Sequence, residues 1–207
     1  MKVVPFTSQG EFGKIFLVTK DLKNYFIIKK ISNTLHFSKE AFILNKLSHI
    51  NIIKFYGITY TKNGFLLKLE YFPSLSLQDY IHYSEKFTAD KIYKIFIQLV
   101  KAIMYLHSID IINTTKNGSV NYLPPEIVVN DRYDLKKVDV FCLGVVLFTL
   151  CTGSAPERDK ELRVVEMHLQ DNEFEELLLK MLFSDPDKRW DINQIHEYLF
   201  SHKEKSK

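Results

Sequence analysis

The stretch Phe65-Leu66-Leu67-Lys68-Leu69-Glu70-Tyr71-Phe72-Pro73-Ser74-Leu75-Ser76-Leu77 marks a change of structural type along the chain. Its first part, Phe65 to Tyr71, is a short apolar run of the kind that forms a strand. From Ser74 onward the apolar residues recur at helical spacing, beginning with a predicted helix from Leu75 to Tyr83. We therefore expect an α+β protein, with a β-rich part at residues 1–72 and a mostly helical part at residues 73–200.

The N-terminal part is expected to be a sheet interrupted by one helix. Two further apolar runs, Ile15 to Val18 and Tyr25 to Lys30, predict strands. Asn63-Gly64 predicts a hairpin turn before Phe65, because both residues tolerate a positive φ angle. Apolar residues at helical spacing between Phe37 and Leu47 predict the helix, with Ser38 as its N-cap.

The C-terminal part is expected to be built from helices. Thr88 to His107 carries a wide apolar face behind a suitable N-cap, Thr88. Asp139 to Thr152 is apolar almost all round, which predicts a central helix, and Gly153 is expected to end it. Two more helices are predicted at Glu173 to Phe183 and at Ile192 to Phe200. The basic but mixed segment at residues 201–207 is expected to be a disordered, solvated tail.

Composition narrows the class of protein. The 207 residues carry a net charge of only +3, and no basic stripe is interleaved with aromatic residues, which argues against nucleic acid as a ligand. The most apolar run, Val138 to Cys151, is too short to span a bilayer, so no membrane association is expected. Cys142 and Cys151 would lie about 13 Å apart along one helix, too far for a disulfide. We expect buried, reduced thiols in a cytoplasmic or nuclear protein.

Two features of the N-terminal part could bind a phosphate. Gly10-Glu11-Phe12-Gly13 lies between two predicted strands and could bring its backbone close to a phosphate, although a plain hairpin turn is an equal alternative. Lys29 ends a strand and Glu40 lies on the helix, so the two could pair, with the lysine holding a phosphate. The alternative is an ordinary solvated pair.

Taken together and in this order, these residues resemble the N-lobe of a protein kinase. Thr7 to Ile15 is similar to the glycine-rich loop, with Ser8 in place of the first glycine. Phe26-Ile27-Ile28-Lys29 resembles the strand that carries the phosphate-binding lysine, and Glu40 resembles its helix partner. Leu69 to Phe72 resembles the gatekeeper and hinge. The resemblance implies a bilobal kinase-like fold with these nucleotide-binding residues: Ser8, Gly10, Gly13, Ile15, Lys29, Glu40, Glu70 and Phe72.

The likeness continues in the C-terminal part. Pro124-Pro125-Glu126 resembles the A-P-E motif of kinases, and Asp139 to Gly144 resembles D-x-W-x-x-G. Asp185 to Arg189 resembles the late arginine motif, which implies that Arg189 pairs with Glu126. The sequence from Thr114 to Glu126 is most similar to that of the Aurora family of Ser/Thr kinases. It places Thr115 where those kinases carry an activating phosphothreonine, and it implies a mitotic or spindle role.

The chain lacks the segment in which a kinase keeps its chemistry. In a kinase, H-R-D-L-x-x-x-N and then D-F-G lie between the approach to the catalytic loop and the end of the activation loop. Here the first of these segments ends at Ile112 and the second begins at Gly118. Only Asn113 to Asn117 lie between them, about three dozen residues fewer than those motifs need. Asp110 precedes the position of that loop and is expected to be a surface turn residue. We therefore expect no catalytic residue and no magnesium site.

Two hypotheses follow from the missing segment. In the first, the protein is a pseudokinase that binds or regulates partner proteins and holds ATP weakly or not at all. In the second, the native gene product is an active ATP-dependent Ser/Thr kinase, of which this chain is a mis-spliced or deleted version. The two clean flanks of the gap suit a single excision, which keeps the second hypothesis open. A third and weaker hypothesis is a decaying paralogue without a stable fold.

Overall fold

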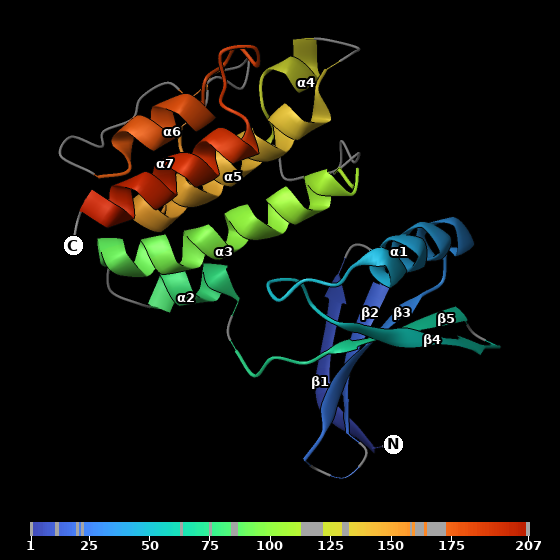
Figure 1. The fold of residues 1–207 in the computed structure, drawn as a ribbon. Helices are drawn as coiled ribbons and strands as arrows, with labels where there is room; N and C mark the ends of the chain where they lie inside the picture. Colours follow the sequence, from blue (N-terminus) through green and yellow to red (C-terminus); the bar gives the residue numbers. More distant parts are fainter. Residues whose placement is uncertain are drawn as a thin grey trace. The chain divides into compact units, whose positions relative to one another are not determined.

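The computed structural model describes residues 2–10, 13–19, 21, 23–62, 64–74, 76–83, 87–112, 122–129, 133–157, 159, 164 and 173–205. The chain divides into two compact units, Met1–Ser74 and Leu75–Lys207. The first holds a sheet and one helix, and the second is helical (Figure 1). Each unit is described by itself below.

The N-terminal unit is a five-stranded antiparallel sheet with the strand order β1-β2-β3-β5-β4 (Figure 1). Its strands are β1 (Lys2–Gly10), β2 (Gly13–Thr19), β3 (Tyr25–Ile31), β4 (Phe55–Thr61) and β5 (Gly64–Glu70). The apolar runs expected to form strands are confirmed.

Helix α1 (Thr34–Lys46) packs against this sheet through a small apolar core. Phe37 and Ala41 of the helix are buried with Ile31 and Leu67 of the sheet. The ring of Phe37 also stacks on that of Phe65, with the centroids 4.3 Å apart. This contact fixes the helix against β3 and β5, which is what positions Glu40.

The start of α1 corrects the predicted cap. Asn33, not Ser38, caps the helix, because its side chain accepts a hydrogen bond from the His36 N–H at 3.0 Å. The Ser38 hydroxyl instead donates to the Thr34 carbonyl one turn back, at 2.9 Å. Residues 34–36 are polar or exposed, so the apolar periodicity began later than the helix itself.

The β4–β5 hairpin closes at the expected glycine. Gly64 has a φ of 125°, and a Cβ there would come within 2.9 Å of the Ile31 carbonyl oxygen. Only glycine fits this conformation and this close approach. Asn63, the other half of the predicted turn, lies outside the described residues.

The C-terminal unit is built on two long helices, α3 (Ala89–Ser108) and α5 (Leu135–Thr152). Thr88 caps α3 as predicted, accepting from the Lys91 N–H at 3.4 Å. Gly153 ends α5 as predicted, with a φ of 85°. Around these two helices the structure places α2 (Leu77–Tyr83), α4 (Glu126–Val129), α6 (Glu175–Met181) and α7 (Ile192–Lys205).

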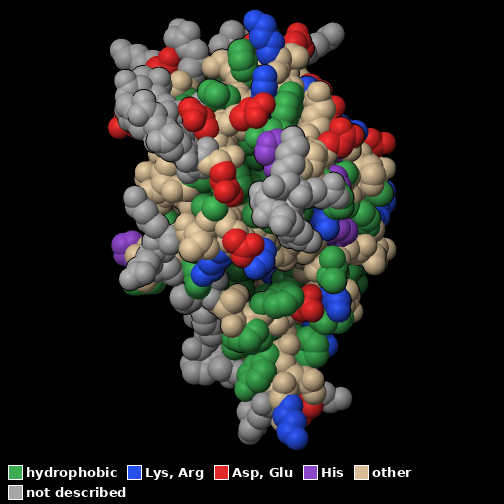
Figure 2. Space-filling view, turned by 60° about the vertical axis from the view of Figure 1, so that its left-hand side comes forward, with side chains coloured by type: hydrophobic (Ala, Val, Ile, Leu, Met, Phe, Trp, Pro, Cys, Tyr) green, Lys and Arg blue, Asp and Glu red, His purple; other side chains and the backbone are tan. Residues whose placement is uncertain are grey.

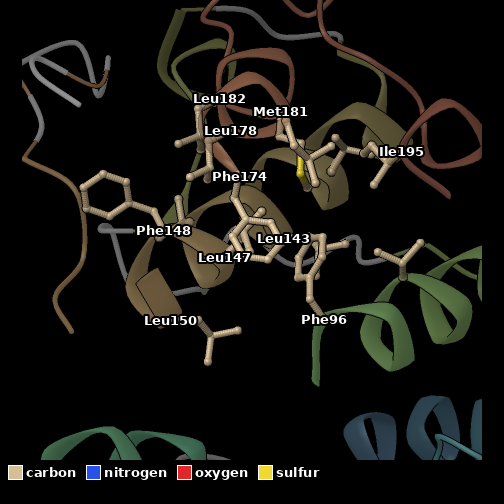
Figure 3. Packing of buried hydrophobic residues seen from close by; sticks show 14 of the residues in the cluster. Phe96, Leu143, Leu147, Phe148, Leu150, Phe174, Leu178, Met181, Leu182 and Ile195 are labelled. Carbon is tan, nitrogen blue, oxygen red and sulfur yellow. The ribbon is translucent and has the colours of Figure 1, made fainter. Parts of the chain in front are cut away.

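Helix α5 is the centre of this unit. Eleven of its residues are buried, and all of these except Asp139 and Thr149 are apolar or glycine, which fits the expected central helix. Figure 3 shows side chains of α5, among them Leu143 and Leu147, packed with residues of α3, α6 and α7. The helix begins four residues before the predicted start, at Leu135, because Asp134 caps it by accepting from the Lys136 N–H at 2.8 Å.

The last two helices differ from their predicted bounds. Helix α6 is shorter at both ends than Glu173 to Phe183. Helix α7 continues to Lys205, five residues into the segment expected to be a disordered tail. Its last turns carry local hydrogen bonds, in which the Ser201 hydroxyl and the His202 ring lie 2.9 and 3.1 Å from the Tyr198 carbonyl. None of the helices in the described ranges is long and apolar enough to cross a membrane.

Replacing Gly144 by alanine should destabilise the C-terminal unit. A Cβ at Gly144 would lie 2.9 Å from both Met181 Cβ and Leu182 Cδ2, so the contact between α5 and α6 has no room for it. We expect a loss of about 1–3 kcal/mol from overpacking, measured by chemical denaturation. Helix propensity alone would give a gain of about 1 kcal/mol, so a more stable variant would contradict the close approach.

Candidate functional site

Three of the predicted nucleotide-binding residues lie in one row across the sheet. Ser8 on β1 is opposite Ile15 on β2, and Ile15 is opposite Lys29 on β3. Residues directly opposite one another on neighbouring strands project from the same face. The register therefore places the Ile15 and Lys29 side chains on one face, and the backbone of Ser8 beside them.

The two predicted loop glycines close the β1–β2 hairpin. Gly10 is the last residue of β1 and is opposite Gly13, the first residue of β2. The turn residues Glu11 and Phe12 lie outside the described residues. Both readings of the sequence, a hairpin and a phosphate-binding loop, require this pairing, so it does not decide between them.

Lys29 and Glu40 form the pair that the resemblance implies. The Lys29 ammonium donates to both carboxylate oxygens of Glu40, at 2.7 and 2.9 Å. The side chains are 19% and 29% exposed, so solvent still reaches the ammonium. A lysine held in this way keeps a fixed point charge on the face that carries Ile15, which is suited to a phosphate.

The two predicted hinge residues lie at the end of β5. The Glu70 carboxylate accepts from the Lys54 N–H at 3.0 Å, and the Glu70 N–H donates to the Lys54 carbonyl at 2.9 Å. Its side chain therefore secures the start of β4. Phe72 is 60% exposed, and its carbonyl accepts from the Ser74 N–H at 2.9 Å. The Glu70 side chain is therefore engaged within the sheet, whereas the Phe72 ring is exposed to solvent.

The structure confirms Asp110 as a surface turn residue. It follows the end of α3 in a left-handed conformation with a φ of 53°. Its side chain is 88% exposed, and one oxygen lies 3.4 Å from the Lys136 ammonium. Residues 113–121, including Thr115, lie outside the described residues. Within the described ranges no three histidine, cysteine, aspartate or glutamate side chains are grouped to hold a metal.

In the C-terminal unit the implied pair of Arg189 and Glu126 is confirmed. The two side chains are almost fully buried and meet in a bidentate contact, with nitrogen–oxygen distances of 2.6 and 3.0 Å. The same guanidinium donates to the Phe183 and Lys137 carbonyls and lies 4.8 Å over the Phe141 ring. All five N–H groups of Arg189 therefore have acceptors.

Sequence reasoning missed a second buried pair. His107 of α3 and Asp139 of α5 lie 3.0 Å apart, with side chains 7% and 10% exposed. The Lys136 ammonium also donates to the His107 carbonyl, at 3.2 Å. The available signal was a polar residue on the apolar face of each of two long helices. The pair ties α3 to α5 just before the point at which the catalytic loop is missing.

The two cysteines are free thiols, as expected, but both are half-buried rather than fully buried. The Cys142 thiol donates to the Tyr122 carbonyl at 3.2 Å. Burial, followed by the nearby Asp139 carboxylate, raises the pKa of Cys142 to about 11. The thiol is therefore protonated at neutral pH and serves packing rather than chemistry.

Comparison with known proteins decides the family. The family model for the protein kinase domain matches residues 6–114 and 112–201. This chain belongs to the protein kinase family. The predicted α+β kinase-like fold is likewise confirmed, since the structure is similar to the crystal structure of Rad53 1-466 in complex with AMP-PNP. That likeness has a TM-score of 0.80 at 20% identity and covers 95% of this chain and 64% of the other.

The similar sequences are Ser/Thr kinases, including Aurora kinases. An Aurora kinase of Yarrowia lipolytica is 26% identical, over 92% of this chain and 65% of its own length. The probable serine/threonine-protein kinase MARK-A of Dictyostelium discoideum is 29% identical, over 98% of this chain. The human SNF-related serine/threonine-protein kinase is 27% identical, over 79% of it. This kinase-family chain spans about a quarter of the length of the latter two.

The same comparisons bear on the missing segment. The two stretches matched by the family model meet at residues 112–114, where the sequence lacks its catalytic loop. The alignment with the Yarrowia kinase has 243 positions but uses 92% of this chain, which is about 190 residues. About 50 aligned positions of that relative therefore have no counterpart in this kinase-family chain.

Proposed function

We propose that this protein is a catalytically inactive member of the kinase family that works as a partner-binding or regulatory pseudokinase. The observation that carries the proposal is the absence of both H-R-D and D-F-G from the whole sequence. The break in the family match at residues 112–114 supports the same conclusion. The proposed partners are proteins of the cytoplasm or nucleus; neither nucleic acid nor a membrane is proposed as a partner.

The missing residues are the ones that phosphoryl transfer requires. A kinase holds magnesium with the D-F-G aspartate and the catalytic-loop asparagine, and the H-R-D aspartate receives the substrate hydroxyl proton. Loss of a general base alone typically lowers the rate by about 10²–10⁴. Asp110 offers no replacement, because it lies in an exposed turn beside Lys136.

The residues that remain fit only the phosphate half of a nucleotide site. Lys29, held by Glu40 and only 19% exposed, can attract a phosphate as a point charge. The D-F-G and catalytic-loop positions that would hold magnesium do not occur in this sequence, so the residues present do not fit the metal. We therefore expect ATP to bind weakly, and we derive no transfer step through it.

The contacts that keep the kinase fold are retained while the chemical residues are gone. The buried pairs Glu126–Arg189 and His107–Asp139 hold the C-terminal unit, and Lys29–Glu40 links α1 to the sheet. A chain whose surfaces had no function would not be selected to keep an ordered fold. Retention of these pairs supports a role in binding and argues against a decaying paralogue.

Purified protein should transfer no phosphate from labelled ATP to a generic substrate such as myelin basic protein. The Lys29→Met variant should give the same background, because the loss of Lys29 removes no working active site. Lys30→Met, on the same strand but projecting from the opposite face, is the matched control. Phosphate transfer that Lys29→Met abolishes and Lys30→Met retains would contradict the proposal.

A second candidate function is an active ATP-dependent Ser/Thr kinase with a mitotic role. It is favoured by the intact Lys29–Glu40 pair and by the two matched stretches, which meet at residues 112–114 as a single excision would leave them. The intact mass of the native protein separates the two candidates. A mass equal to these 207 residues supports the pseudokinase, whereas a protein heavier by the missing segment supports the kinase.

A further inference from the structure

The N-terminal unit has an open groove of about 700 Å³ away from Lys29. It lies at the end of the sheet where β2 ends, β3 and β4 begin and β5 ends. Figure 2 shows hydrophobic side chains gathered in the lower part of the view, with Lys or Arg beside Asp or Glu side chains at the lower end. The volume is in the range of sites that hold ligands.

Aromatic rings form the walls of the groove. The rings of Tyr25 and Tyr71 lie 5.8 Å apart in a tilted contact on one face of the sheet. Those of Phe26 and Tyr56 lie 5.5 Å apart, edge to face, on the opposite face, so the groove runs around the end of the sheet. Leu17, which is buried, forms part of its floor. These rings are fixed by one another, so a ligand need not order them on binding.

The groove is rich in unused hydrogen-bond donors. Among the described residues, no partner is found for the hydroxyls of Tyr25, Tyr56 and Tyr71, each of which can donate or accept a hydrogen bond. Lys23 is exposed, and its ammonium forms no ion pair with any described residue. The Lys68 ammonium lies 3.7 Å over the Phe26 ring and 5.8 Å over the Tyr56 ring, which brings a second positive charge to the same walls.

Two carboxylates at the groove, by contrast, already accept hydrogen bonds within the protein. The Glu70 carboxylate accepts from the Lys54 N–H and lies 4.0 Å from the Lys54 ammonium. Asp21, in the adjoining turn, accepts from the N–H groups of Lys23 and Asn24 at 3.1 and 2.8 Å and from the Asn24 side chain at 2.6 Å. These hydrogen bonds lower the pKa of Asp21.

We propose that this groove binds an extended, acidic segment of a partner protein. Such a segment supplies carboxylates and backbone carbonyls to the free donors and lays apolar side chains against the rings. Single-stranded nucleic acid would also bring acceptors, but the chain has a net charge of only +3 and no basic stripe to follow a phosphate backbone. The inference names a surface for the proposed partner-binding role and rests on that role.

The test uses the full 207-residue protein and fluorescence anisotropy. The probes are a labelled decapeptide that alternates glutamate with apolar residues, the same peptide with glutamine in place of glutamate, and an oligothymidylate. We expect the acidic peptide to bind at least about tenfold more tightly than the glutamine peptide, with an affinity that falls as salt is raised. Equal binding of the two peptides, or tighter binding of the oligothymidylate, would overturn the proposal.

Variants locate the binding. Lys23→Glu combined with Lys68→Glu should weaken the acidic peptide about tenfold, whereas Lys101→Glu, exposed on α3, should leave it unchanged. Tyr56→Phe with Tyr71→Phe removes two hydroxyls but keeps the rings and the fold, and should weaken binding about threefold to tenfold. Unchanged affinity in both groove variants would reject this site. The phosphate-transfer assay is separate, so activity there with peptide binding intact would reject only the pseudokinase role.

Discussion

Replacing Arg189 by methionine is expected to lower the free energy of unfolding of the C-terminal unit by about 3–5 kcal/mol, the usual cost of removing one partner of a buried ion pair. The Glu126 side chain is only 2% exposed, so its charge would stay in the interior without a partner. The Phe183 and Lys137 carbonyls would lose their donors as well. Urea denaturation followed by fluorescence measures the loss, because the single tryptophan, Trp190, lies in this unit.

Two further variants separate the ion pair from a general effect of substitution. Lys188→Met removes an adjacent exposed charge whose ion pair with Asp185 has a distance of 3.6 Å, and it should change the stability by less than about 0.5 kcal/mol. Adding Glu126→Gln to Arg189→Met should restore part of the loss, because the unpaired charge is then gone. Losses that simply add in the double variant would show that the two side chains do not act as a pair.

The two pairs predicted from the sequence, Lys29–Glu40 and Glu126–Arg189, became predictable only through the order of many short motifs. Spacing alone indicates neither pair: a lysine and a glutamate eleven residues apart are usually solvated, and Glu126 and Arg189 lie 63 residues apart. The ordered likeness to a kinase placed Lys29 on a strand and Glu40 on the helix. In the structure the register of β3 and the packing of Phe37 bring these two side chains together.

The features that could not be predicted from the sequence are a contact between two crossing helices and the positions at which two helices begin. The His107–Asp139 pair forms because α3 and α5 pack side by side in the C-terminal unit, and no local pattern encodes that crossing. Asn33 and Asp134 cap helices whose first three residues each include only one apolar side chain, so apolar periodicity placed both starts too late. The nucleotide-binding roles of Ser8 to Phe72 remain predictions, because the geometry is equally that of a stable sheet.

The N-terminal groove shows why such surfaces escape sequence patterns. Tyr25, Tyr56 and Tyr71 lie on three different strands or their ends, and only the antiparallel register places them at one end of the sheet. In the sequence each stands beside a phenylalanine, in a strand or next to one, where aromatic residues are ordinary. The free donors and occupied acceptors become visible only when the hydrogen bonds are known.

Phe96→Ala should be the other large loss of stability, about 3–5 kcal/mol. Phe96 is fully buried, and Figure 3 shows it projecting from α3 into the cluster formed around α5. Removal of the ring loses its transfer free energy and leaves a cavity, because the long helices on both sides cannot close over it. The Trp190 fluorescence midpoint in urea should fall, whereas Lys101→Ala, exposed on the same helix, should move it little. A Phe96→Ala loss below about 1 kcal/mol would mean that the core relaxes around the site, and that the kinase fold here is less tightly packed without its catalytic segment.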